Sequence, residues 1–250
     1  MPQAVYERPF VLHFSTMTID GRIASATGYS ILSCKFDKLR LYLLRGMVNA
    51  VMVGASTVNI DNPRLARRIG DVKPYYRVVV DGRLSTSPNA RVYNDTSVPT
   101  IVFTGGSAPR EKIEELRRRG VEVVVVGEGH RVNLGDALRI LLENYGVKRV
   151  LVEGGGVLAH SLHRERLVDE LRVTIAPVLF AAGRSIVDDP EGRGFTEWPA
   201  SPRLSLECHE VCPCGHCIHL VYRVRDAQCC PVSTPPPRCL ADRILRAARL

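Results

Sequence analysis

Residues 150–162 read VLVEGGGVLAHSL, and this stretch decides which fold the chain can adopt. Apolar residues around Glu153 are typical of a buried strand, three consecutive glycines follow, and a helix can begin near Val157. Glycines leave backbone N–H groups open to a phosphate, and a helix N-terminus favours negative charge. A tight strand-to-helix turn explains the same residues, and a Rossmann G-x-G-x-x-G fingerprint is missing. The stretch alone leaves both interpretations open.

Strand-like and helix-like segments alternate along the rest of the chain. Strands are expected at 10–16, 50–57, 76–82, 98–106, 121–127, 148–156 and 170–180, with 121–127 buried on both faces. Helices are expected at 34–45 with Gly46 as the cap, between a Ser107 cap and Gly120, at 134–145, and from about residue 157. Residues 203–212 and 217–225 read as an antiparallel hairpin. This order predicts an α/β fold with a mainly parallel central sheet, helices on both faces and a C-terminal antiparallel hairpin.

The composition excludes several classes of protein. The chain has 250 residues, of which 45% are hydrophobic and 24% charged, as in ordinary globular proteins. It shows no apolar run near the roughly 20 residues of a membrane span and no signal peptide, so we expect a cytoplasmic protein without a membrane partner. The net charge of +8 is spread along the chain and aromatic residues make up only 6%, which favours an anionic small molecule over nucleic acid.

We expect one large catalytic domain and a short C-terminal segment of different composition. Residues 1–225 carry the strands and helices of a catalytic domain. Residues 226–250 begin as a Cys- and Pro-rich linker and end in a short basic amphipathic tail. The tail could pack on the body, cover a dimer seam or be disordered.

A second motif, VGASTVNIDNPRLARR at 53–68, follows another strand. Thr57 and Asp61 stand four residues apart and would share one face of a helical turn. A hydroxyl and a carboxylate suit a ribose or a polar ring edge, and Arg64, Arg67 and Arg68 suit a phosphate. A capped turn before a solvated basic stretch explains the segment equally well.

A third stretch, STMTIDGRIASATGYS at 15–30, offers Asp20 and Ser30. An Asp-Gly pair such as Asp20–Gly21 is usually only a turn. Asp20 and Glu153 are nevertheless the acids that the sequence places best to orient a substrate ring or to pass a proton. We therefore take both as candidate catalytic residues.

Together, TIDG, GASTVNIDNPRL and VEGGG resemble, in this order, the riboflavin-pathway reductases. These are the free-standing archaeal and fungal diaminohydroxy-ribosylaminopyrimidinone phosphate reductases and the reductase half of the bacterial bifunctional deaminase-reductase. The resemblance runs from about residue 10 to about residue 224. It implies a dihydrofolate reductase-like fold, a homodimer, and an NADPH-dependent oxidoreductase of riboflavin biosynthesis. The substrate would be a pyrimidinone ribosyl 5′-phosphate, reduced to the ribitylamino form by hydride transfer to C1′ of the ring-opened imine.

The resemblance also implies site residues. Contacts to NADPH are expected from Thr57, Asp61, Gly82, Gly154, Gly155, Gly156, Val157 and Leu158. Contacts to the substrate are expected from Ser30, Arg45, Leu65, Arg68 and Glu153, with the two arginines on the phosphate. Two positions depart from the family pattern: Gly82 stands where a serine is expected, and Ala181–Ala182 replace a glycine pair.

The cysteines are concentrated at one end, since seven of the eight follow residue 207. Cys208, Cys212, Cys214 and Cys217 belong to the expected hairpin, but their spacing is not that of a paired C-x2-C zinc site. A Cys212–Cys217 disulfide, a zinc site and free thiols all stay open, and no metal is expected at the reductase site. The zinc motif of the deaminase half is also missing, so a reductase alone is expected. Three further cysteines that could pair or stay free lie in the tail: Cys229, Cys230 and Cys239.

Two alternative functions remain at this point. One is a dihydrofolate or other pterin-type reductase on the same fold. The other, from a different class, is a metal- or nucleic-acid-binding module built around the cysteine hairpin and the basic tail. Substrate-dependent NADPH oxidation would separate the first from the pyrimidine reductase, and metal analysis would test the second.

Overall fold

The computed structural model describes residues 7–197, 200–225, 237, 239–240 and 243–244. Within this part of the chain, one sheet contains β1 (Phe10–Thr18), β3 (Ala50–Gly54), β4 (Tyr76–Val80), β5 (Thr100–Thr104), β6 (Glu122–Val125), β7 (Arg149–Glu153), β8 (Glu170–Ala176), β10 (Leu204–Val211) and β11 (Ile218–Val224). A small ribbon pairs β2 (Arg22–Ser25) with β9 (Gly183–Ser185). The helices are α1 (Lys35–Arg45), α2 (Ala55–Asp61), α3 (Arg91–Asn94), α4 (Arg110–Arg118), α5 (Leu134–Tyr145) and α6 (Gly156–Arg164).

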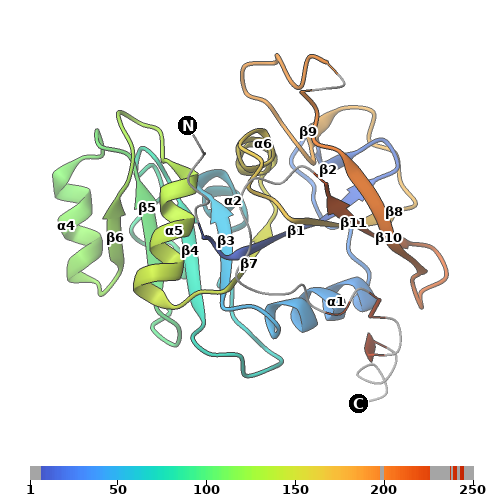
Figure 1. The fold of residues 1–250 in the computed structure, drawn as a ribbon, viewed down its shortest axis with the longest axis horizontal. Coiled ribbons are helices and arrows are strands. Elements are labelled where there is room, and N and C mark those ends of the chain that lie inside the picture. Colours follow the sequence, from blue (N-terminus) through green and yellow to red (C-terminus); the bar gives the residue numbers. More distant parts are fainter. Residues whose placement is uncertain (1–6, 198–199, 226–236, 238, 241–242, 245–250) are drawn as a thin grey trace.

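The strand order in the large sheet is β10-β11-β8-β1-β7-β3-β4-β5-β6. All pairs from β8 to β6 are parallel, whereas β11 is antiparallel to both β8 and β10. In Figure 1, α4 and β6 lie at the left end of this sheet, and the β10–β11 hairpin lies at the right. The predicted mainly parallel sheet with a C-terminal antiparallel hairpin is confirmed.

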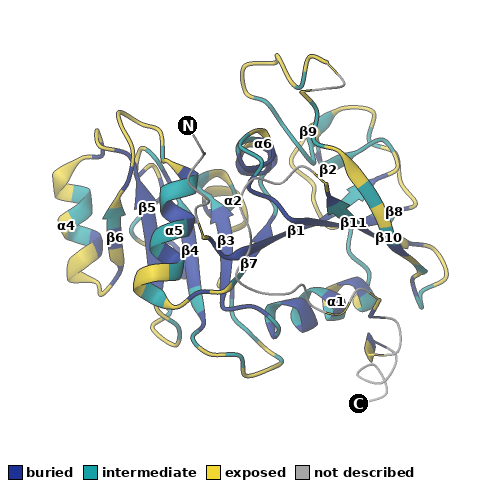
Figure 2. Ribbon diagram, in the orientation of Figure 1, coloured by how far each residue is buried: buried dark blue, intermediate teal, exposed yellow. Residues whose placement is uncertain are grey.

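Helices cover both faces of the sheet because successive strand residues point to opposite sides. On β1, Phe10 and Leu12 belong to the apolar cluster that includes residues of α1, α2 and α4, while Val11 belongs to the cluster that includes residues of α5 and α6. The same alternation on β3 sends Val51 to the first cluster and Met52 to the second. Figure 2 shows the resulting buried strands between partly exposed helices.

Helix α5 begins and ends where the sequence predicts. Asn133 accepts a hydrogen bond from the backbone N–H of Asp136 at 3.0 Å, and Gly146 ends the helix in a left-handed conformation with φ 65°. These are the capping devices that Asn and Gly favour.

Three local predictions were wrong. The strand expected at 50–57 ends at Gly54, and Ala55 already opens α2. Pro109 rather than Ser107 precedes the first residue of α4, without a side-chain cap. The segment 121–127 is not buried on both faces, because β6 is the last strand of the sheet and Val125 is 46% exposed. Its valines reflect the preference of β-branched side chains for strands and not double burial.

The described residues of the C-terminal tail contact the body. Cys239 forms a disulfide with Cys208 on β10, and Leu240 and Ile244 are fully buried in the cluster that contains Leu44 of α1. Most of 226–250, including Cys229 and Cys230, lies outside the described residues, so the proposed domain boundary at 225/226 stays a prediction. Among the described residues, no helix is both long and apolar enough to cross a membrane.

Candidate active site

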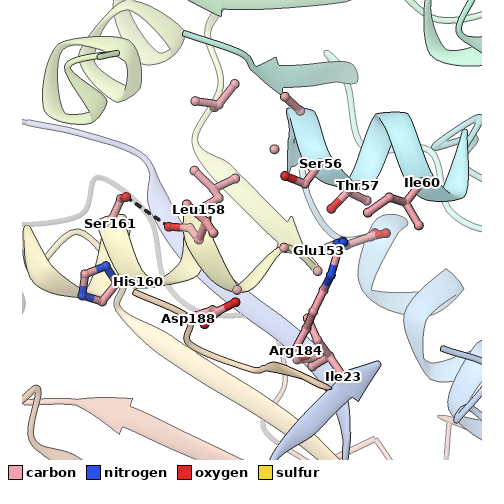
Figure 3. A pocket seen from close by; sticks show the side chains of 18 of the residues that line it. Ile23, Ser56, Thr57, Ile60, Glu153, Leu158, His160, Ser161, Arg184 and Asp188 are labelled. Atoms are coloured by element: carbon pink, nitrogen blue, oxygen red, sulfur yellow. Dashed lines mark hydrogen bonds between the residues drawn. The ribbon is translucent and has the colours of Figure 1, made fainter. Parts of the chain in front are cut away.

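A cavity of about 1010 Å³ lies at the carboxyl ends of the parallel strands, as is usual for ligand sites in such sheets. Its walls include the strand ends of β1, β3, β4 and β7, the helices α2 and α6, and the β2–β9 ribbon. Figure 3 shows side chains of α2, α6 and β9 converging on it. The volume lies at the upper end of the range typical of small-molecule sites.

Glu153 is the last residue of β7, and its carboxylate pairs with Arg45, the last residue of α1. Arg45 Nε donates to one carboxylate oxygen at 2.7 Å and Nη2 donates to the other at 2.6 Å. The third guanidinium nitrogen, Nη1, donates to the carbonyl of Ala66 at 3.1 Å. Burial lowers the pKa of Arg45, but the adjacent carboxylate outweighs it and the net shift is upward. Arg45 therefore presents a fixed, permanently charged guanidinium at the cavity wall.

The glycine turn after Glu153 has the geometry of a ligand-binding turn. Gly154 and Gly155 have φ values of 60° and 79°, which side chains rarely adopt. A Cβ on Gly155 would approach Thr57 Oγ1 to 3.0 Å, and a Cβ on Gly156 would meet the carbonyl oxygen of Ser185 at 2.3 Å. The turn is thus bare on the side that faces Thr57.

Two helices begin at this turn and at the end of β3. Gly155 precedes α6 and Gly54 precedes α2, and neither helix has a side-chain cap or an acidic residue in its first turn. Within the described residues, the N-terminal backbone N–H groups of these helices thus lack a capping side chain, and such groups can contact an anion. The phosphate-binding interpretation of 150–162 stays a prediction.

Asp61 ends α2 one turn after Thr57, as the spacing predicted. Burial raises the pKa of Asp61, and the positive charge of Arg184 opposes that shift. Figure 3 shows Arg184 extending from β9 towards α2. Asp61 and Arg184 thus place one acidic and one basic group on the same side of the cavity.

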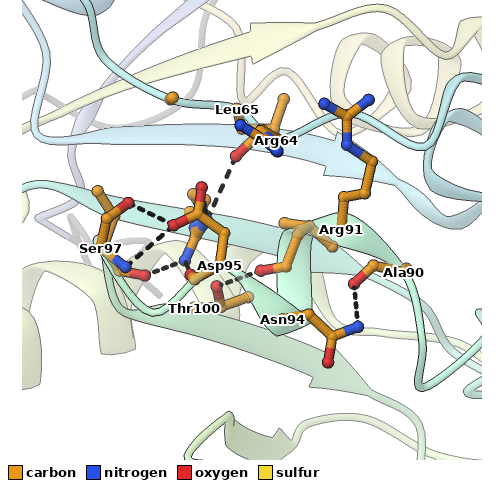
Figure 4. A network of polar contacts seen from close by, with 12 residues as sticks. Arg64, Leu65, Ala90, Arg91, Asn94, Asp95, Ser97 and Thr100 are labelled. Atoms are coloured by element: carbon orange, nitrogen blue, oxygen red, sulfur yellow. Dashed lines mark hydrogen bonds and ion pairs between the residues drawn. The ribbon is translucent and has the colours of Figure 1, made fainter.

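Leu65 is held in the cavity wall by a network of polar contacts. It has a left-handed backbone (φ 51°), and its carbonyl accepts from Tyr75 Oη at 3.2 Å. The buried Arg77 of β4 donates to the carbonyl of Arg64 at 3.3 Å and forms an ion pair with Asp95 at 3.6 Å. Figure 4 shows Arg64 and Leu65, from the segment after α2, beside Asp95 and Ser97, from the loop after α3. A buried arginine thus positions a segment that lines the site.

Gly82 follows β4 and lines the cavity, at the position where the family resemblance led us to expect a serine. A Cβ at this position would lie 2.0 Å from the carbonyl oxygen of His130. The backbone around His130 therefore occupies the space that a serine side chain needs, which is a physical reason for the departure.

Most predicted site residues meet in this one cavity. Those that line it are Ser30, Arg45, Thr57, Asp61, Leu65, Gly82, Glu153, Gly154, Gly155, Gly156, Val157 and Leu158. Asp20 and Arg68 are not among the lining residues. Both carboxylate oxygens of Asp20 accept backbone N–H groups of the 180–181 loop, at 3.1 and 2.8 Å. The guanidinium of Arg68 lies 4.8 Å from the ring centroid of Tyr42, which Arg45 also approaches, at 6.0 Å.

Several lining residues were missed from the sequence. His160, Ser161 and Arg164 follow Val157 at helical spacing on α6, so periodicity could have found them. Arg184 and the segment 188–191 carry no motif, and only the pairing of β2 with β9 brings them to the site.

A pair of buried histidines connects β1 with α6. His13 Nδ1 of β1 is 3.2 Å from His163 Nε2 of α6. Burial, with a smaller effect of His163, lowers the pKa of His13 to about 3, and burial, with a smaller effect of His160, lowers that of His163 to about 4. Both rings are therefore neutral at neutral pH.

Comparison with known proteins shows the family of the chain. The sequence model of the RibD C-terminal domain matches residues 9–220. The chain belongs to the RibD C-terminal domain family. A 2,5-diamino-6-ribosylamino-4(3H)-pyrimidinone 5′-phosphate reductase of Methanothermobacter thermautotrophicus is 42% identical over 205 residues, covering 80% of this chain and 92% of that protein.

Larger relatives share the same domain. The riboflavin biosynthesis protein RibD of Bacillus amyloliquefaciens is 32% identical over 79% of this chain, which spans 53% of it. The solved structure of Acinetobacter baumannii RibD matches with a TM-score of 0.74 at 23% identity, over 88% of this chain and 59% of that one. The RibD structure confirms the predicted fold class, and the family places the chain among the oxidoreductases of riboflavin biosynthesis.

Proposed function

We propose that the chain reduces the ribosylamino side chain of 2,5-diamino-6-ribosylamino-4(3H)-pyrimidinone 5′-phosphate to the ribitylamino form, with NADPH as the reductant. The observation that carries this proposal is the single cavity in which the Glu153–Arg45 pair adjoins two uncapped helix N-termini. The names of the relatives favour this substrate over its deaminated counterpart.

The cofactor end of the cavity is formed by α2, α6 and the glycine turn. The helix N-termini and the bare backbone of Gly154 and Gly155 suit the phosphates of a dinucleotide. Thr57 and Asp61 offer a hydroxyl and a carboxylate to a ribose. Four arginines that line the cavity beside its acidic residues are candidates to bind the extra phosphate of NADPH: Arg83, Arg131, Arg164 and Arg184.

The substrate end is formed by Ser30, Leu65 and the Glu153–Arg45 pair. Bound NADPH would supply the hydride that reduces C1′ of the imine left when the ribose ring opens. Glu153 orients the pyrimidine, since its carboxylate is fixed by two hydrogen bonds and lines the cavity. Arg45, together with Arg68 beside Tyr42, supplies positive charge for the 5′-phosphate. The catalytic role of Asp20 stays a prediction, since its carboxylate is bound to the 180–181 loop.

The test is a set of NADPH oxidation assays with the purified chain. The loss of absorbance of the reduced nicotinamide measures the rate. We expect turnover with NADPH and the diamino substrate, slower turnover with the deaminated pyrimidine, and none with dihydrofolate. Turnover of dihydrofolate alone would support the pterin-type alternative. A binding titration with NADPH that shows no saturable signal would contradict the cofactor assignment.

We also propose that the enzyme is a cytoplasmic homodimer. The outer strand β10 and its neighbour β11 carry exposed apolar side chains at Leu204, Leu206, Val211 and Ile218, which is unusual for a free sheet edge. Light scattering should give twice the chain mass, and Leu206→Lys should shift it towards the monomer. Val125→Lys on the opposite edge strand is the matched control and should leave the mass unchanged.

A further inference from the structure

A cluster of four thiols lies outside the cavity, between the tip of the β10–β11 hairpin and the start of α1. Cys212, Cys214 and Cys217 come from the hairpin turn, and Cys34 comes from the residue before α1. All four are free thiols, and Cys212 and Cys217 are buried. The Cys212–Cys217 disulfide that the sequence left open is therefore not formed here. Cys34 is 178 residues from Cys212, so the spacing of the cysteines does not predict their contact.

The sulfur atoms converge as metal ligands do. Cys34 Sγ and Cys212 Sγ are 3.5 Å apart, and the sulfurs of Cys34, Cys212 and Cys214 all lie within 4.8 Å of one another. Cys217 Sγ shares a hydrogen bond with Cys214 Sγ. Tetrahedral zinc with Zn–S bonds of about 2.3 Å separates its sulfurs by about 3.8 Å. The sulfurs of Cys34, Cys212 and Cys214 are already close to that spacing, and Cys217 is linked to this group of three through Cys214.

Backbone N–H groups are directed at these sulfurs. The N–H of Asp37 donates to Cys34 Sγ at 3.4 Å, at the N-terminus of α1. Cys214 Sγ accepts backbone hydrogen bonds from His216 and Cys217, and Cys212 Sγ accepts one from Cys214. Such donors stabilise thiolates, which are the form that binds a metal.

A buried positive charge beside the cluster lacks an acceptor. Arg40 of α1 is fully buried, and among the described residues none of its three guanidinium nitrogens has a hydrogen-bond partner. Cys212 is one of the groups whose charge acts on Arg40, together with Asp37 and Glu210. Asp37 and Glu210 offset the charge of Arg40 against that of the neighbouring Arg172, and Zn²⁺ with four thiolates, at a net charge of about −2, would add further negative charge beside it.

We propose that Cys34, Cys212, Cys214 and Cys217 bind one structural zinc ion, which joins the hairpin tip to the N-terminus of α1. Four protein sulfurs leave no open coordination position, and none of these cysteines lines the cavity, so the ion takes no part in hydride transfer. The ion holds Cys34 in place, at the end of the segment before α1 that contains the cavity-lining residues Ser30 and Ser33. The proposal does not depend on the proposed reaction.

The test is metal analysis of the full chain, purified without chelators under reducing conditions. Plasma mass spectrometry should find about one zinc per chain, and X-ray absorption should find four sulfurs at about 2.3 Å. Replacement by Co²⁺ should give the thiolate charge-transfer and visible bands of a tetrahedral cobalt site. These measurements use the unmodified protein, so they do not depend on the folding of a variant.

Two variants test the ligands, and one serves as a control. Cys34→Ser and Cys214→Ser should each lose most of the zinc, while Cys208→Ser with Cys239→Ser, which removes the disulfide, should keep it. A chelator should lower the melting temperature of the unmodified chain and leave that of Cys34→Ser unchanged. Metal-free protein, full zinc in Cys34→Ser, iron in place of zinc, or a Cys34–Cys212 disulfide in fresh protein would each overturn the proposal.

Discussion

The Glu153–Arg45 pair allows a prediction of defined size. In Glu153→Gln, the amide oxygen can accept one hydrogen bond from Arg45, but the amide nitrogen faces a guanidinium donor and the negative charge is lost. Breaking a fully buried ion pair costs about 3–5 kcal/mol. The two side chains keep exposures of 12% and 11%, and one hydrogen bond survives, so we expect a loss of about 2–3 kcal/mol in the free energy of unfolding.

The assays are urea denaturation and steady-state kinetics. A loss of this size should lower the melting temperature by roughly 5–10 °C for a chain of this length. The value of kcat should fall by about 100-fold, because the carboxylate that orients the pyrimidine is gone. The dissociation constant of NADPH should stay within about twofold, since the cofactor end of the cavity is untouched.

The matched control removes an ion pair of the same chemistry on the surface. Glu115 and Arg119 form an i,i+4 pair at 2.9 Å on α4, with both side chains about one-third exposed. Glu115→Gln should cost no more than about 0.5 kcal/mol and leave kcat unchanged. If both variants lose the same stability and Glu153→Gln keeps its kcat, the reasoning about this pair is wrong.

Three further predictions concern stability. The pKa values of His13 and His163 are lowered to about 3 and 4, so below pH 6.5 the unfolded chain binds more protons than the folded chain. The free energy of unfolding should therefore fall towards pH 4, by up to about 2.7 kcal/mol per pH unit for the two histidines. In urea denaturation at a series of pH values, His163→Gln should flatten this slope, and an unchanged slope would exclude the pair as its source. Gly82→Ser should destabilise by about 1–3 kcal/mol through the clash with His130, and thermal denaturation that shows no loss would contradict the close approach. Arg77→Met should cost about 2–4 kcal/mol, because it leaves buried carbonyls without their donor, and a cost below 1 kcal/mol in urea denaturation would count against that role.

The parallel core could be predicted from the sequence because its signals are local. Strand and helix patterns alternate, and Asn133 and Gly146 mark the ends of α5. The spacing of Thr57 and Asp61 on one turn is likewise a local signal, and it places both in the cavity.

The features that could not be predicted depend on pairing between distant segments. Arg184 reaches the cavity only because β9 pairs with β2 across about 160 residues, and Cys34 meets the hairpin across a similar distance. The edge position of β6 depends on the strand order, which the valine run 123–126 does not reveal. The bidentate contact of Arg45 with Glu153 exists because the end of α1 lies beside the end of β7. The sequence does not show this proximity, so the only partner predicted for Arg45 was the substrate phosphate.

The position of β1 has a consequence for synthesis on the ribosome. Of the strands in this sheet, β1 (Phe10–Thr18) is translated before all the others, yet it lies between β7 and β8, which end at residues 153 and 176. A nascent chain that ends before residue 176 cannot flank β1 on both sides, so the apolar residues of β1 stay accessible until β8 has been translated. Growth of the sheet therefore waits on late segments, and contacts between such distant segments slow folding. Fragments that stop before β8 should aggregate, whereas release of β8 should protect β1 from proteolysis.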